Sequence, residues 1–168
     1  TTDDYHIHTL NSLGWELTVV NALYPENSPC RRALLHNAPF GAQLFHFLED
    51  KIPLARLKTV LEVGGGLGYL MKDFLNLNPN LQATLLDISP LLLQKQRETL
   101  TGYPVNYQEM DFLKMPVTDL RAFDLVILNE NLGDFPTLFF QQNQAEQNDP
   151  DTIRSLSRVA DYMKAYDL

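Results

Sequence analysis

The sequence predicts an α/β domain in which a parallel β-sheet carries helices on both faces, preceded by a helical region. Three observations predict it. Between residues 57 and 128, short apolar runs typical of buried strands alternate with segments of helical periodicity. Residues 1–57 show helical spacing without such runs. The 168 residues, 45% of them hydrophobic, suit one domain with a buried core.

The N-terminal region is expected to contain three helices. Apolar residues recur at helical spacing as far as Val20, and Pro25 ends that segment. Ser28 followed by Pro29 is a favourable N-cap and first-turn pair for the second helix. Four apolar residues indicate the third helix: Ala42, Leu44, Phe45 and Leu48.

The α/β region follows in strict alternation. The predicted strands are residues 59–63, 83–88, 105–107 and 123–128, the third being the weakest. A helix with its apolar face over residues 67–75 follows the first strand. The next helix begins after Ser89-Pro90 and stops near Gly102.

The C-terminal part carries no further strand signal. Residues 141–151 are rich in Gln, Asn and acidic side chains and read as a linker, and residues 152–166 have helical spacing. The predicted organisation is therefore a helical region (1–57), an α/β core (58–140), and a linker with a last helix (141–168). We expect the sheet to lack its last strands.

The most informative segment joins the first strand to its helix and reads Leu61-Glu62-Val63-Gly64-Gly65-Gly66-Leu67-Gly68. Glycines let the backbone approach a ligand closely, and a helix N-terminus adds free N–H groups. A P-loop would need Gly-Lys-Ser/Thr here, and a dinucleotide fingerprint would need glycine where Tyr69 stands. Gly64, Gly66 and Gly68 preceded by Glu62 instead resemble the first motif of the class I S-adenosylmethionine (AdoMet) methyltransferases.

Acidic residues follow the next two strands. Asp87, 19 residues after Gly68, can accept hydrogen bonds from both hydroxyls of a ribose, and Ile88 beside it is a further cofactor-binding candidate. The resemblance implies that Asp111 binds the adenine amino group and that Phe112 packs on the ring. We expect these residues and the glycine loop to converge at the carboxyl ends of the strands, where open α/β sheets bind ligands.

Two stretches resemble one family within this class, the MidA-like methyltransferases. The run from Leu86 to Leu100 resembles the second-strand region of that family, and the segment after the fourth strand shares four of its residues: Asn129, Glu130, Asp134 and Pro136. The chain departs from the family at Asp87, where Glu is usual, and at Phe135, where Ala is usual. The resemblance implies a three-layer Rossmann-like methyltransferase fold, a link to respiratory complex I assembly, and dimethylation of a protein arginine.

Two carboxylates after the fourth strand are the candidate catalytic residues. A guanidinium is charged and weakly nucleophilic, and a carboxylate can pair with it, orient it and support proton loss. We assign this role to Glu130, with Asp134 as a second acid. Asn129 can bind the amino-acid part of the methyl donor or the acceptor. The alternative interpretation is that Asn129-Glu130 only forms a turn and that Asp134 caps the next segment.

The predicted function is methyl transfer from AdoMet to a protein or small-molecule acceptor. One alternative is an assembly factor that binds AdoMet without catalysis. Another is an NAD-dependent oxidoreductase, which the missing glycine at Tyr69 disfavours.

The composition limits the kinds of partner that we expect the protein to bind. The net charge of −8 argues against nucleic acid and anionic membranes. A single cysteine, Cys30, excludes an internal disulfide, and His6 with His8 lacks further ligands for a metal site. An exposed sheet edge would allow a homo-oligomer. The expected location is the cytoplasm, or the mitochondrial matrix if a transit peptide has been removed.

Overall fold

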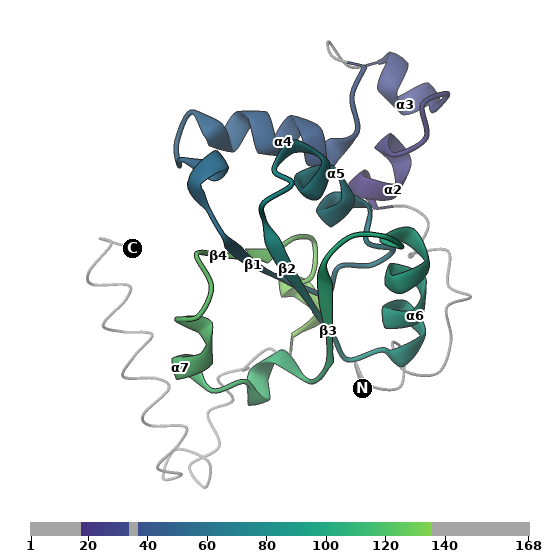
Figure 1. The fold of residues 1–168 in the computed structure, drawn as a ribbon. Helices are drawn as coiled ribbons and strands as arrows, with labels where there is room; N and C mark the ends of the chain where they lie inside the picture. The colour runs from purple at the N-terminus through teal and green to yellow at the C-terminus, as the bar shows by residue number, and fades with distance from the viewer. Residues whose placement is uncertain (1–17, 34–36, 136–168) are drawn as a thin grey trace, which may run out of the picture. The chain divides into compact units, whose positions relative to one another are not determined.

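The computed structural model describes residues 18–33 and 37–135 (Figure 1). It contains a four-stranded parallel sheet in the order β3-β2-β1-β4. The strands are β1 (Thr59–Val63), β2 (Gln82–Asp87), β3 (Val105–Glu109) and β4 (Leu125–Leu128). The chain builds outward from β1 to β3 and then returns to the other side of β1. The reversal of strand order therefore lies between β1 and β4, which is where such sheets bind ligands.

Helices precede and connect the strands. Before the sheet come α2 (Val19–Leu23), α3 (Pro29–Arg32), α4 (Phe40–Glu49) and the 3-10 turn η2 (Leu54–Arg56). Between and after the strands lie α5 (Tyr69–Leu77), α6 (Pro90–Thr99), η3 (Phe112–Lys114), α7 (Val117–Leu120) and η4 (Leu132–Asp134). The predicted α/β architecture is confirmed, whereas the predicted helix over residues 152–166 lies outside the described residues.

Local capping signals define the helix starts as predicted. The Ser28 hydroxyl accepts a hydrogen bond from the Cys30 N–H at 3.1 Å, and the Ser89 hydroxyl accepts one from the Leu92 N–H at 3.3 Å. The fourth strand is shorter than predicted. The Asp124 carboxylate accepts hydrogen bonds from the N–H groups of Lys58 and Thr59, at 2.8 and 3.1 Å, so the residue before β4 is bound to the start of β1.

The sheet buries apolar side chains on both faces, because successive residues of a strand point to opposite sides. On one face Val60 belongs to the larger cluster, in which α4 packs against α5 through an edge-to-face pair of Phe45 and Phe74 rings 5.2 Å apart (Figure 1). On the other face Leu61 joins a smaller cluster, which Phe112 and neighbouring side chains of η3 and α7 cover. The larger cluster fixes α5, and with it the glycine loop, against the sheet.

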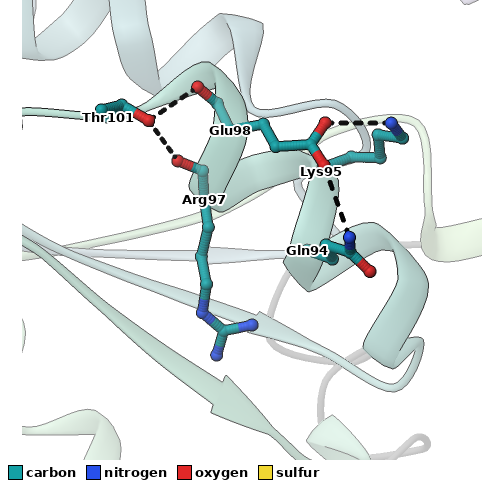
Figure 2. Close-up of polar contacts among 5 residues, drawn as sticks. All are labelled: Gln94, Lys95, Arg97, Glu98 and Thr101. Atoms are coloured by element: carbon teal, nitrogen blue, oxygen red, sulfur yellow. Dashed lines mark hydrogen bonds and ion pairs between the residues drawn. The ribbon is translucent and has the colours of Figure 1, made fainter.

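Helix α6 has a polar outer surface. Figure 2 shows the Glu98 carboxylate bound to the Lys95 ammonium at 2.9 Å and to the Gln94 amide at 3.5 Å. The Thr101 hydroxyl donates to the carbonyls of Arg97 and Glu98, at 3.0 Å each, and closes the last turn. Leu92, Leu93 and Leu100 lie on the opposite side of α6 and are buried, which orients that side toward the protein interior. None of the helices in the described ranges has the length and apolar character needed to span a bilayer.

Candidate functional site

The glycine loop between β1 and α5 adopts the backbone that its sequence predicts. Gly64, Gly66 and Gly68 have φ values of +63°, +54° and +82°, in the left-handed region that side chains disfavour. Gly68 is the N-cap of α5, and its N–H donates to the Gly65 carbonyl at 2.8 Å. A Cβ on Gly66 would meet no atom within 4 Å. The loop therefore presents bare backbone beside open space.

Glu62 is buried next to this loop. Its side chain is 3% exposed, and burial, helped by the nearby Asp87 charge, raises its pKa to about 8. One carboxyl oxygen, Oε2, has no hydrogen-bond partner within the described part of the chain. A Cβ on Gly65 would lie 3.1 Å from that oxygen, so the carboxyl group sits directly against the loop. A cationic group bound here would supply the missing partner and favour the ionised carboxylate.

Asp87 lies at the end of β2, beside the glycine loop as predicted. The residue is 4% exposed, and its carboxylate accepts hydrogen bonds from the Ser89 N–H at 2.9 Å and the Gln96 side-chain amide at 3.0 Å. Ile88 follows and is half-buried. The structure therefore brings Glu62, the loop and Asp87 together, although these residues come from two strands.

Asp111 and Phe112 lie after β3, also as predicted. The Asp111 carboxylate accepts a hydrogen bond from the Leu113 N–H at 3.0 Å, which caps η3, and lies 3.6 Å from the Lys114 ammonium. The Phe112 ring stacks on Phe135 with centroids 5.9 Å apart. These contacts explain why the segment turns here, and the adenine-binding roles of the two residues stay predictions.

The segment after β4 has an unusual backbone. Glu130 has a φ of +56°, and no other non-glycine residue in the described ranges has a positive φ. Such strain is concentrated at functional sites. The exposed Glu130 carboxylate accepts hydrogen bonds from the Val19 N–H at 3.4 Å and the Asn129 amide at 3.5 Å. Asp134 ends η4, and its side chain lies outside what the structure describes.

Asn131 is a site residue that sequence reasoning missed. Its side chain is 8% exposed and donates a hydrogen bond to the Val63 carbonyl. A Cβ on Gly64 would lie 2.8 Å from the Asn131 amide nitrogen. This amide therefore ties the end of β4 to the start of the glycine loop. No local signal identifies it, because an asparagine after a strand is usually an exposed turn residue.

Gln96 was also missed, and here a signal was available. It lies three or four residues from the buried Leu92, Leu93 and Leu100, which places it on the buried face of α6. Its amide donates to the Gly66 carbonyl at 3.1 Å and to Asp87. A polar residue at an apolar position of a helix indicates a buried hydrogen-bonding role.

Two contacts join the N-terminal helical region to residues of the candidate site. Besides the Val19 contact with Glu130, the ring of Tyr24 stacks on Tyr69 with centroids 3.6 Å apart. Tyr69 is the first residue of α5, directly after the glycine loop. These two contacts place residues 19–24 beside the predicted cofactor site.

A parallel sheet in the order β3-β2-β1-β4, with a glycine loop after β1 and a carboxylate ending β2, defines a Rossmann-like cofactor-binding domain. A family model described as a methyltransferase domain matches residues 61–164, well over half of the chain. The chain belongs to this family of methyltransferase domains. The match confirms the predicted methyltransferase class of the domain and favours it over an NAD-dependent oxidoreductase.

Two curated relatives are malonyl-[acyl-carrier protein] O-methyltransferases. The protein from Neorickettsia risticii (strain Illinois) is 33% identical over 87 residues, which are 51% of this chain and 34% of the relative. The protein from Anoxybacillus flavithermus (strain DSM 21510 / WK1) is 31% identical over 72 residues, or 43% and 27%. The match thus spans between about a quarter and a third of the length of these relatives.

Solved structures of methyltransferases are also similar. The mitomycin 7-O-methyltransferase MmcR is 28% identical, with a TM-score of 0.39 over 45% of this chain and 22% of that one. The plantazolicin methyltransferase BpumL, in complex with SAH, is 12% identical, with a TM-score of 0.36 over 64% and 44%. None of these four proteins is described as a MidA-like methyltransferase, so that narrower assignment stays a prediction.

Proposed function

We propose that this chain binds AdoMet between the glycine loop and Asp87 and transfers its methyl group to an oxygen atom of the acceptor. The observation that carries the proposal is the buried Glu62 carboxyl group, which lies against the glycine loop with one oxygen unpartnered among the described residues. A buried carboxyl oxygen without a partner is unfavourable unless a ligand satisfies it. AdoMet carries positive charge on its ammonium and sulfonium groups and meets that requirement.

We assign a different part of AdoMet to each residue around the loop. Glu62 offers a carboxylate to a cationic group, and the glycine loop offers N–H groups and close approach. Asp87 accepts hydrogen bonds from ribose hydroxyls, while Asp111 and Phe112 are assigned to the adenine. When bound, AdoMet supplies an electrophilic methyl group.

Glu130 is the proposed catalytic residue. A hydroxyl acceptor must lose a proton as its oxygen is methylated, and the exposed carboxylate of Glu130 can accept that proton. The Asn129 amide, 3.5 Å away, orients this carboxylate, and Asp134 is proposed as a second acid. Oxygen as the acceptor atom is supported by the two curated relatives, which are O-methyltransferases of malonyl-[acyl-carrier protein]. A malonyl carboxylate is already ionised at neutral pH, so the base role of Glu130 applies only to an acceptor that must lose a proton.

A protein arginine is the second candidate acceptor. The same Glu130 carboxylate can pair with a guanidinium, and the net charge of −8 attracts a cationic partner. The MidA-like sequence resemblance also supports this acceptor. An acidic acceptor, in contrast, would approach Glu130 against charge repulsion, so the two candidates differ in what the Glu130 carboxylate does.

Calorimetric titration with S-adenosylhomocysteine tests the cofactor site, with NAD as the control ligand. We expect binding of S-adenosylhomocysteine alone, a gain in unfolding free energy of about 2.7 kcal/mol at 100 times Kd, and loss of binding in Asp87→Asn. Asp50→Asn, an exposed change at the end of α4, is the matched control. A folded protein that binds NAD, or neither ligand, would refute the proposal.

Radiolabelled AdoMet then tests the acceptor and the catalytic residue. Malonyl-[acyl-carrier protein] and an arginine-containing peptide are offered in parallel to the wild type and to Glu130→Gln. We expect Glu130→Gln to retain cofactor binding and to lose methyl transfer to the arginine-containing peptide, whose guanidinium must lose a proton, while transfer to the ionised malonyl carboxylate is not reduced. Unchanged transfer to the peptide in this variant, or labelling of malonyl-[acyl-carrier protein] alone by the wild type, would remove Glu130 from the mechanism. A wild type that binds the cofactor but labels neither acceptor would favour the assembly factor without catalysis.

A further inference from the structure

Gln96 is a buried amide in the middle of an otherwise amphipathic helix. Its exposed fraction is 0%, whereas Gln94, Lys95 and Glu98 of the same helix form the solvent-facing network in Figure 2. Burying a carboxamide is unfavourable unless its polar atoms are hydrogen-bonded. A fully buried polar side chain therefore needs hydrogen-bond partners, and the identity of these partners indicates its role.

Both partners of Gln96 belong to the proposed cofactor site. Its Nε2 donates one hydrogen bond to the Gly66 carbonyl at 3.1 Å and one to Asp87 Oδ2 at 3.0 Å. An amide nitrogen has two N–H donors, so both are used. The Gln96 Oε1 atom has no partner among the described residues. The side-chain amide is oriented with Nε2 toward Gly66 and Asp87, because the reverse orientation would place Oε1 against two acceptor oxygens.

The two hydrogen bonds of the Gln96 amide connect segments that follow different strands of the sheet. Gly66 follows β1, while Asp87 ends β2, 21 residues later. The Ser89 N–H holds the other Asp87 oxygen at 2.9 Å, so both oxygens of the carboxylate are held by donors of this chain. A Cβ on Gly68 would lie 3.4 Å from the Cα of Gln96, and this close approach of α6 to the loop brings the amide within reach.

We propose that Gln96 is a positioning residue that holds the glycine loop and Asp87 at a fixed separation for AdoMet. The inference rests on the cofactor site proposed above. A ligand that contacts both elements at once binds best when their separation is set before it arrives. Gln96 acts through these two neighbours and has no assigned contact with the cofactor.

The first test replaces the amide without changing the length of the side chain. Gln96→Met removes both donors, and Gln94→Met on the exposed side of α6 is the matched control. We expect Gln96→Met to weaken S-adenosylhomocysteine binding by about tenfold, as loss of hydrogen bonds to a charged group and a carbonyl implies, while Gln94→Met binds like the wild type. Binding by a folded Gln96→Met within twofold of the wild type would overturn the proposal.

A second variant separates positioning from general destabilisation. In Gln96→Glu the new carboxyl group lies beside Asp87. When protonated it can donate to Asp87 Oδ2, and when ionised it repels that carboxylate. We expect its affinity, divided by that of the wild type at the same pH, to be highest at pH 5.5 and to fall by about tenfold or more by pH 8. This readout also decides the outcome if Gln96→Met does not fold.

The results distinguish this inference from the proposed function. A folded wild type that fails to bind S-adenosylhomocysteine overturns both. A wild type that binds, together with a Gln96→Glu affinity ratio that is the same at both pH values, overturns the positioning role alone. Gln94→Glu provides the control for adding a negative charge to α6.

Discussion

Replacing Glu62 by Gln should stabilise the unliganded protein, and increasingly so as the pH rises. The folded protein holds the Glu62 proton up to a pKa of about 8, against an ordinary value of 4.5. Between these values the unfolded chain binds fewer protons than the folded one, so stability falls as the pH increases. At about 1.4 kcal/mol per pKa unit, the ionisable group destabilises the fold by about 5 kcal/mol above pH 8.

Urea unfolding followed by circular dichroism measures this effect at pH 5.5 and 7.5. We expect the gain in unfolding free energy of Glu62→Gln over the wild type to grow by about 3 kcal/mol between the two pH values. The pKa of Asp73, which burial raises to about 6, affects both proteins equally and cancels. Glu26→Gln, at an exposed position, is the control. A Glu62→Gln gain that is the same at both pH values would refute the reasoning.

Three further changes test the geometry, each by urea unfolding. Gly41→Ala should lower stability by about 1–3 kcal/mol, because its Cβ would lie 2.7 Å from Asp73 Oδ2, while Gly133→Ala, with open space, should be nearly neutral. Equal losses would contradict the packing at α4. Glu130→Gly should raise stability by about 1 kcal/mol by relieving the left-handed backbone, and an unchanged value would argue against strain. Asn131→Ala should cost about 2 kcal/mol, because the Val63 carbonyl loses its donor, and a neutral effect would remove that hydrogen bond from the account.

The features that the sequence predicted correctly depend on local interactions. Strand β1 coincides with the predicted residues 59–63, and the caps at Ser28 and Ser89 form as expected. The left-handed backbone of Gly64, Gly66 and Gly68 also follows directly from residue type. Each of these features depends on neighbours a few residues apart, so hydrophobic periodicity and capping chemistry are sufficient to place them.

By itself, the sequence determined the α/β class, the glycine loop and the acidic residues that follow the strands. Only the tertiary structure revealed the amides that join these elements. Asn131 bonds to Val63, 68 residues away, and Gln96 bonds to Gly66, 30 residues away. The raised pKa of Glu62 is equally non-local, because it depends on burial and on Asp87 of the neighbouring strand. Such contacts follow from strand order and helix packing, which local spacing does not specify.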